Sequence, residues 1–280
     1  MDNNIITTEH ITAYADHLRA EERSPGTIAK YTRDLTAFAL WLDGRGVTKE
    51  NATAWKACLL NRDYAPRTVN AMLAAVNGFC RFAGLPIKLK FLSIQRQIFR
   101  DSAKELTKEE YDRLLTAARE SGQERLALIM ETLCATGIRI SELRYITVEA
   151  AKDGRATITL KGKIRTILLP AKLCRKLVKY ARKQKIAAGE IFLTKSGRPI
   201  TRRQVWFELK RLCKAAGVEA SKVFPHNLRH LFATTFYRAC RDIVRLADML
   251  GHSSIDTTRI YLMVSGAEQQ RQLDRLGLVS

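Results

Sequence analysis

Three of the five histidines, several arginines and two tyrosines fall between residues 224 and 261, in the segment FPHNLRHLFATTFYRACRDIVRLADMLGHSSIDTTRIY. A proline favours the start of a helix here, and His226 and Arg229 then lie three positions apart on one face of that helix. His252 follows a Leu-Gly pair that ends another helix, and Tyr261 follows the next short helix. Such groups can bind a phosphodiester and attack it, because guanidiniums hold phosphate oxygens and an activated tyrosine is a nucleophile.

Each of these signals is weak when it stands alone. An isolated histidine is more often a hydrogen-bonded core residue than a catalyst. A single tyrosine is ordinarily an amphipathic residue at the edge of a core. Chemistry is therefore expected only if other parts of the chain bring matching groups to the same place.

The chain of 280 residues is strongly basic. Its 48 Lys and Arg residues exceed its 28 Asp and Glu residues, so the formal net charge is +20 and the sequence pI is about 10.0. The net charge is +4 over residues 1–103 and +16 over residues 104–280. Such an excess favours a polyanionic partner, most commonly nucleic acid, although a solvated basic surface is the simpler alternative.

Length and composition favour two globular domains, because 280 residues can build two hydrophobic cores. No apolar run is long enough to span a bilayer, and the N-terminus lacks the basic and apolar regions of a signal peptide. We therefore expect no membrane partner and a cytoplasmic, nucleoid-associated protein. The six cysteines stand singly, without a C-x-x-C pair, which predicts reduced core residues.

Residues 1–84 are predicted to form an N-terminal domain of helices joined by short connections, which is typical of a small bundle. The four helices are expected at residues 11–22, 27–42, 49–61 and 66–84. Polar and basic side chains near the starts of the second and fourth helices could contact phosphates or a groove, although capping and solvation explain such residues more often. These candidates are Thr27, Lys30, Tyr31, Arg67, Thr68 and Asn70.

Residues 85–104 contain a proline and five basic side chains without a clear period, so they are predicted to link this domain to a second one at residues 105–280. The second domain is predicted to be mostly helical, with one β-hairpin. Its strands are expected at residues 156–160 and 164–169. The tip of this hairpin carries Lys161 and Lys163 on either side of a glycine.

A further short strand is predicted at residues 191–194. The helix that begins at Thr201 carries Arg202 and Arg203 in its first turn. These two arginines and Lys163 complete the set of candidate contacts to nucleic acid.

Four separated motifs occur in the order and setting of one known family. They are ATGIRISEL around Arg139, a lysine at a hairpin tip, PHNLRH around His226, and LGHSSIDTTRIY, which ends at Tyr261. Together they resemble the tyrosine recombinase family of the Xer and phage-integrase kind, over nearly the whole chain. The resemblance implies a mainly α chain, in which an N-terminal four-helix SAM-like core-binding bundle precedes a mostly helical catalytic domain with a small β-hairpin.

The resemblance also assigns roles to single residues. Arg139 and Arg229 match the two arginines that hold the scissile phosphate in this family. His226 matches the first histidine of the H-x-x-R box, His252 matches the second histidine, and Tyr261 matches the nucleophile. A tyrosine hydroxyl has a pKa of about 10, so it needs a proton acceptor and a positive field to react at neutral pH.

The catalytic lysine has two candidates. The family commonly shows G-K-G at the hairpin, where this sequence has Leu160, Lys161, Gly162 and Lys163. Alignment on the glycine favours Lys161, with Lys163 as the alternative. A lysine beside other cations has a lowered pKa and can protonate a leaving 5′ hydroxyl.

The resemblance implies a site-specific DNA recombinase that cuts and rejoins duplex DNA through a 3′-phosphotyrosyl intermediate, in integration, excision or dimer resolution. Because that intermediate conserves the bond energy, no cofactor, ATP or metal ion is expected, and the sequence shows no Gly-rich phosphate loop or acidic cluster for Mg²⁺. The resemblance further implies a homo-oligomer on a specific DNA site, with two protomers on each site and four in a synapse, or a hetero-oligomer with a related recombinase.

Two other functions stay open at this point. A catalytically inactive or accessory DNA-binding protein could share the fold, but it would be expected to have lost Arg139, Arg229 or Tyr261, and all three are present. A type IB topoisomerase uses closely similar chemistry. The length and the N-terminal bundle favour recombination over that alternative, whereas the chemistry alone does not separate them.

Overall fold

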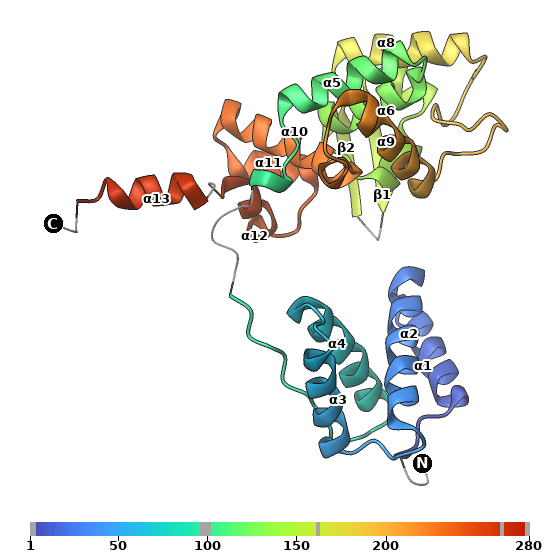
Figure 1. Cartoon of the computed structure of the whole chain (residues 1–280). Helices are drawn as coiled ribbons and strands as arrows, with labels where there is room; N and C mark the ends of the chain where they lie inside the picture. Colours follow the sequence, from blue (N-terminus) through green and yellow to red (C-terminus); the bar gives the residue numbers. More distant parts are fainter. Residues whose placement is uncertain (1–3, 96–101, 161–162, 264–265, 278–280) are drawn as a thin grey trace. The chain divides into compact units, whose positions relative to one another are not determined.

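The structure is a computed structural model that describes residues 4–95, 102–160, 163–263 and 266–277. The chain divides into two compact units, Met1–Arg96 and Gln97–Ser280. Helices dominate both units, and the sheet in the described residues is a two-stranded hairpin (Figure 1). The prediction of a mainly α fold with a helical N-terminal bundle and one hairpin is confirmed.

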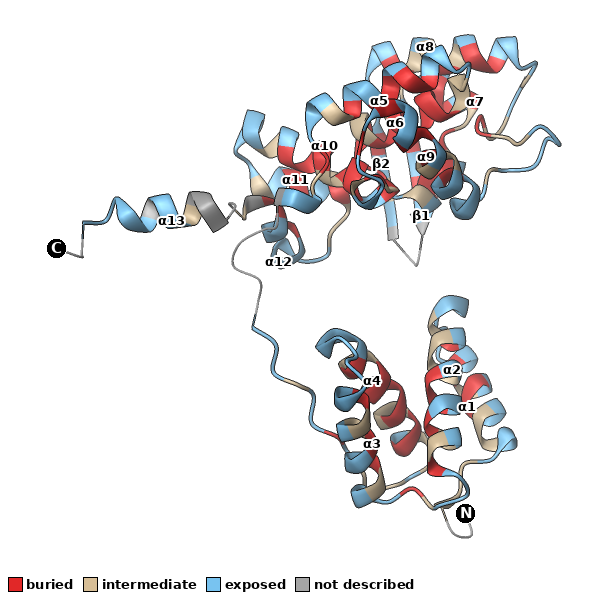
Figure 2. Ribbon diagram, in the orientation of Figure 1, coloured by how far each residue is buried: buried red, intermediate tan, exposed pale blue. Residues whose placement is uncertain are grey.

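The N-terminal unit is a bundle of four helices packed around one core. Ser24 and Thr48 cap two of the helices, since each side chain accepts a hydrogen bond from a backbone N–H in the first turn. Prolines occupy the first turn of the second and fourth helices, where a missing N–H costs nothing. Buried positions lie along the inner faces of these helices (Figure 2), and the core that they form includes Leu35, Phe38 and Phe79. The helices are α1 (Thr8–Ala20), α2 (Pro25–Leu42), α3 (Lys49–Asn61) and α4 (Pro66–Phe82).

Two asparagines of α4 hold the chain that follows this bundle. Asn70 Nδ2 donates to the Leu92 carbonyl at 2.9 Å, and the Leu92 N–H donates back to Asn70 Oδ1 at 2.7 Å. Asn77 makes the same pair of bonds with Leu89, at 3.0 and 2.8 Å. Residues 85–95, predicted as part of a linker, therefore belong to the N-terminal unit, where Leu89 is buried.

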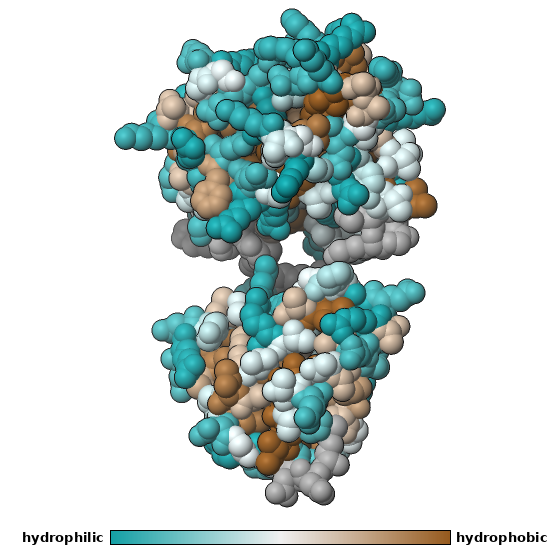
Figure 3. Space-filling model, turned by 90° about the vertical axis from the view of Figure 1, so that its right-hand side faces the viewer, coloured by the Kyte–Doolittle hydropathy of each residue, from teal (hydrophilic) through white to brown (hydrophobic). Residues whose placement is uncertain are grey.

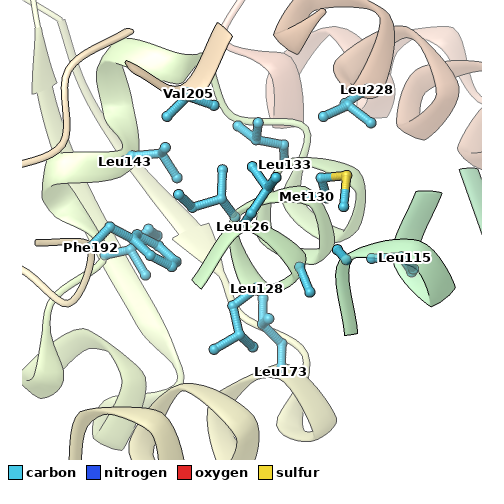
Figure 4. Close-up of a cluster of buried hydrophobic side chains, with 14 of the residues drawn as sticks. Leu115, Leu126, Leu128, Met130, Leu133, Leu143, Leu173, Phe192, Val205 and Leu228 are labelled. Carbon is cyan, nitrogen blue, oxygen red and sulfur yellow. The ribbon is translucent and has the colours of Figure 1, made fainter. Parts of the chain in front are cut away.

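The C-terminal unit is built around one helix that is apolar on nearly every side. The side chains of Leu126, Ile129, Met130 and Leu133 on this helix, α6, are almost completely buried. Figure 4 shows Leu126, Met130 and Leu133 among apolar side chains of other elements, such as Leu228. A helix with this pattern must be covered all round, which explains why helices gather on several sides of it.

The elements of the C-terminal unit follow in chain order: η2 (Ser102–Lys104), α5 (Lys108–Glu120), α6 (Glu124–Thr136), η3 (Ile140–Tyr145), α7 (Val148–Asp153), β1 (Arg155–Leu160), β2 (Lys163–Leu168), α8 (Ala171–Lys183), α9 (Arg202–Ala216), η4 (Ala220–Lys222), α10 (Pro225–Cys240), α11 (Ile243–Leu250), α12 (Ile255–Thr258), η5 (Arg259–Leu262) and α13 (Gly266–Asp274). The elements from α10 to η5 contain the segment between residues 224 and 261 that the sequence singles out.

Strands β1 and β2 pair antiparallel, in a register that runs from Arg155 opposite Leu168 to Leu160 opposite Lys163. The predicted strand at residues 191–194 is wrong. Only one isolated bridge involves these residues, between Leu193 and Pro199. The backbone of this stretch is instead satisfied by loop hydrogen bonds, such as that from the Thr194 N–H to the Arg198 carbonyl at 2.7 Å.

The surface shown in Figure 3 is mostly hydrophilic, and its apolar residues form only small patches. Among the described residues, no helix combines the length and the apolar character that crossing a membrane requires.

Candidate active site

Arg229, in the second turn of α10, is almost completely buried, with 2% of its surface exposed. Its Nη1 donates to the Gly137 carbonyl at 2.6 Å, and its Nη2 donates to the Leu250 carbonyl at 2.8 Å. Both carbonyls lie at helix C-termini, where carbonyls lack partners within their own helix and carry partial negative charge. Burial and the charge of Arg139 lower the pKa of Arg229 to about 10, so it stays charged at neutral pH.

His252 follows Gly251, which ends α11 in a left-handed conformation. The Nη2 of Arg229 lies 3.0 Å from His252 Nε2. Because a guanidinium can only donate, Nε2 accepts and the ring hydrogen is on Nδ1. Nδ1 then donates to Thr258 Oγ1 at 2.9 Å. These two bonds fix both the neutral tautomer and the plane of the ring.

His252 should make the stability of the protein depend on pH. Desolvation and the charges of Arg229 and Arg139 lower its pKa to about 4, from about 6.5 in an unfolded chain. Between these values the unfolded chain binds a proton that the folded protein does not. The contribution of His252 to stability is therefore complete above about pH 6.5 and is lost as the pH falls towards about 4.

NMR titration of the His252 ring checks this expectation, and it should show no protonation between about pH 7 and pH 5. In the same interval, the variant His252→Asn should show a weaker dependence of unfolding free energy on pH than the wild type. A ring that titrates near its ordinary pKa would contradict the hydrogen-bond arrangement.

Tyr261 lies in η5, directly after the short helix α12, as predicted. Tyr261 is 5% exposed and belongs to a small buried apolar cluster with Phe232. The ring stacks on His252 with centroids 6.2 Å apart and planes 11° apart, and His230 lies at 5.0 Å on a tilted plane. The hydroxyl of Tyr261 lies near Arg229, and its interaction with that guanidinium opposes the fall in the pKa of Arg229. The tyrosine, one arginine and the second histidine are thus in mutual contact.

Arg139 reaches this site from the turn between α6 and η3. Its side chain is 43% exposed, whereas the carboxylate of Glu142 below it is buried. Glu142 accepts the Arg139 backbone N–H at 2.7 Å and the Arg139 Nη1 at 3.3 Å. The guanidinium is therefore anchored on one side and available to a ligand on the other.

A cavity of about 670 Å³ opens in front of these groups. Its wall includes Arg139, Arg165 and His252, with the hydroxyl groups of Ser141 and Thr257. Two guanidiniums and several donors around one hollow provide a site suited to an anion such as a phosphodiester.

His226 begins α10 and is exposed, although protein atoms desolvate part of its ring. This desolvation and the charges of Arg229 and Arg139 lower the pKa of His226. The imidazole is therefore neutral at pH 7 and can accept a proton. Arg202, at the start of α9, contributes to the same field, which places it near the site.

The structure describes the backbone of only one of the two candidate lysines. Lys161 lies outside the described residues, and Lys163 is the first residue of β2.

The candidate DNA contacts lie at the helix starts expected for them. Arg67 and Thr68 are exposed in the first turn of α4, and Arg202 and Arg203 are exposed in the first turn of α9. The others have partners within the protein. The Thr27 hydroxyl is bonded to Ser24 Oγ, Lys30 pairs with Asp34, half-buried Tyr31 borders a cavity between α1, α2 and α4, and Asn70 binds Leu92.

Sequence reasoning misses three residues that support the site, namely Glu142, Arg165 and Thr258. The E-L of ATGIRISEL contains Glu142, three residues after Arg139, which is the spacing of a local cap. Arg165 and Thr258 carry no comparable signal, because their contacts to Glu142 and His252 depend on tertiary packing.

Comparisons of this chain with protein-family models and with individual proteins point to the same family. Residues 104–268 match the model of the phage integrase family, and residues 11–84 match that of the phage integrase N-terminal SAM-like domain. Tyrosine recombinase XerA of Pyrococcus furiosus is 29% identical over 100% of this chain and 98% of its own length. Tyrosine recombinase XerC of Roseiflexus castenholzii is 32% identical over 90% of this chain and 88% of its own.

Solved structures show the same fold at lower identity. XerH bound to a palindromic difH substrate has a TM-score of 0.72 and 18% identity, over 98% of this chain and 90% of its own. A lambda integrase tetramer bound to a Holliday junction has a TM-score of 0.73 and 20% identity, over 93% of this chain and 78% of its own. The chain belongs to the phage integrase family of tyrosine-type site-specific recombinases, enzymes that transfer DNA strands.

Proposed function

We propose that Tyr261 attacks the scissile phosphate of a specific duplex DNA site and forms a 3′-phosphotyrosyl bond. Arg139 and Arg229 hold the nonbridging oxygens, on which charge develops in the transition state. His226 accepts the proton of the tyrosine hydroxyl, and His252 orients Arg229 and the tyrosine ring. The contact of Tyr261 with both Arg229 and His252 is the observation that carries this proposal.

The bond that breaks joins the phosphorus to the 5′ oxygen of the next nucleotide. That oxygen leaves as a hydroxyl and must gain a proton, which Lys161 supplies in our proposal, with Lys163 as the alternative. Rejoining is the reverse reaction, with a 5′ hydroxyl of either DNA partner. The reaction conserves the phosphodiester energy in the tyrosyl ester, so the chemistry of these residues is sufficient for it.

Replacement of the leaving oxygen by sulfur should identify the lysine. A 5′ thiolate is a much weaker base than an alkoxide and departs without a proton. We expect Lys161→Ala to slow cleavage of an ordinary duplex by about 10²–10⁴-fold, and much less with the 5′-thio substrate. Lys163→Ala is the matched control, and cleavage of both substrates should be equally affected by it.

The opposite pattern, with thio rescue of Lys163→Ala alone, would move the role to Lys163. Its place at the start of β2, next to the hairpin tip, makes this a concrete alternative. An equal defect of both variants on both substrates would remove leaving-group protonation from the hairpin.

We further propose that both units contribute to DNA binding, through Arg67 and Thr68 of α4, Arg202 and Arg203 of α9, and the charge of +20. Thr27, Lys30, Tyr31, Asn70 and Lys163 are the additional candidates. The solved relatives include a lambda integrase dimer on a core site and a tetramer on a Holliday junction. By analogy, two protomers would occupy each site and four would form the synapse, alone or with a related recombinase, within the cytoplasmic nucleoid.

Covalent capture tests the proposal. The protein is trapped on fragmented genomic DNA, the attached strands are sequenced, and the recovered duplex is used to size the complexes and to follow strand exchange. One recurrent sequence, with exchange between two copies of it, supports site-specific recombination. Relaxation of supercoiled DNA without exchange would favour a topoisomerase, and binding without an adduct would favour an accessory protein. A site at the chromosome terminus or at a mobile-element junction separates dimer resolution from integration.

A further inference from the structure

Arg165 connects three parts of the active site, although no motif points to it. It lies on β2, and its side chain is 15% exposed. Its Nη2 donates to Glu142 Oε2 at 2.7 Å, and its Nη1 donates to the Met249 carbonyl at 2.7 Å. One guanidinium therefore joins the hairpin to the Arg139 turn and to the end of α11, close to His252.

Gly251 is what lets Arg165 reach this position. The glycine has a φ of +63°, and a Cβ atom there would lie 2.7 Å from Arg165 Cδ. A side chain at position 251 would therefore meet both a strained backbone and the stem of this arginine. The turn that places His252 is packed directly on Arg165.

The charges of Arg139, Glu142 and Arg165 matter as much as their contacts. Buried Glu142 carries one negative charge and lies between two guanidiniums. Arg165 makes the shorter bond to it, at 2.7 Å, and Arg139 the longer one, at 3.3 Å. Because Arg165 neutralises the Glu142 carboxylate, these three side chains together keep one net positive charge. That charge lies at the exposed guanidinium of Arg139.

We propose that Arg165 is a positioning residue for DNA cleavage. By neutralising Glu142 it keeps the Arg139 guanidinium available to the scissile phosphate, and by holding the Met249 carbonyl it fixes the turn of His252. This inference rests on the proposed function of Arg139 and adds a residue to it. Without Arg165, Glu142 would draw Arg139 down into a neutral pair.

Second-site compensation provides the sharpest test. We expect Arg165→Gln to lower the cleavage rate of a duplex carrying the captured sequence by about 10²-fold, comparable to the loss of one preorganised donor. In our proposal the defect comes from an uncompensated carboxylate. The double variant Glu142→Gln/Arg165→Gln should therefore cleave at least about tenfold faster than Arg165→Gln. Arg155→Gln, an exposed arginine at the start of β1, is the matched control and should cleave like the wild type.

A charge-free phosphate gives an independent readout. A methylphosphonate at the scissile position lacks the charged nonbridging oxygen that Arg139 would hold, so the ratio of wild-type to Arg165→Gln rates should shrink on that substrate. If Arg165→Gln merely damaged the structure, the ratio of wild-type to variant rates would be the same on both substrates. A double variant no faster than Arg165→Gln, with an unchanged ratio, would overturn the inference.

The His252 ring supplies a test that needs no DNA. The positive charge of Arg165 is one of those that disfavour protonation of this ring. NMR titration should therefore show a higher pKa for His252 in Arg165→Gln than in the wild type, with Arg155→Gln unchanged. An unchanged titration would contradict the link between Arg165 and the His252 turn. A wild type that titrates as expected but forms no covalent adduct would overturn the proposed function instead.

Discussion

Tyr261→Phe should abolish the covalent protein–DNA adduct completely while binding of the same duplex stays within about twofold. Only the hydroxyl oxygen is lost from a ring that stacks on His252 and lies near Arg229. Loss of this one polar group should cost no more than about 0.5–1.5 kcal/mol of stability, which leaves the protein folded. Denaturing gels of a nicked substrate report the adduct, and fluorescence anisotropy reports binding.

Tyr237→Phe is the matched control for this experiment. Tyr237 lies on α10 and is half-buried, beside Arg241 and not beside His252. We expect this variant to form the adduct at the wild-type rate. An adduct that persisted in Tyr261→Phe would show that another residue is the nucleophile.

The second large effect concerns the two arginines, which should be equally important for cleavage and unequally important for stability. Arg229→Lys removes donors from two helix-end carbonyls that are buried with it, and each unsatisfied carbonyl costs about 1–3 kcal/mol. Arg139→Lys changes a side chain that is 43% exposed, so its unfolding free energy should barely change. Both variants should cleave about 10²–10³-fold more slowly, because lysine cannot hold two phosphate oxygens in the way a planar guanidinium does.

Chemical denaturation and single-turnover cleavage measure the two quantities separately. The cleavage rates are compared without denaturant, at a temperature at which circular dichroism shows that both variants are folded. Equal stability of the two variants would contradict the burial of Arg229. Wild-type cleavage by either variant would remove that arginine from the phosphate site.

Local signals in the sequence predict much of this fold. Proline at Pro66 and Pro225, glycine at Gly137 and the Thr107 cap mark helix boundaries that the structure shows within a few residues. These signals work because a cap or a fixed φ acts within one turn of chain. The strand predicted at residues 191–194 fails for the same reason, since a strand needs a partner that composition does not provide.

The sequence indicates single residues of the site but not the contacts between them. Family motifs indicate Arg229 and His252, yet nothing in the sequence shows that they bond to each other or which ring nitrogen carries the hydrogen. The Glu142–Arg165 ion pair joins residues on different elements, so only packing reveals it. Asn70 illustrates a related case. Its place near the start of a helix suggests a nucleic-acid contact, and only the structure shows that its amide also holds the Leu92 backbone.

Mass spectrometry of the trapped adduct tests the central claim most directly. The covalent complex is digested with protease and nuclease, and the modified peptide is fragmented. The account predicts one modified residue, Tyr261, linked through phosphate to a 3′ nucleotide, with a free 5′ hydroxyl on the released strand. A nucleotide on any other residue, or a 5′-phosphate linkage to Tyr261, would contradict it.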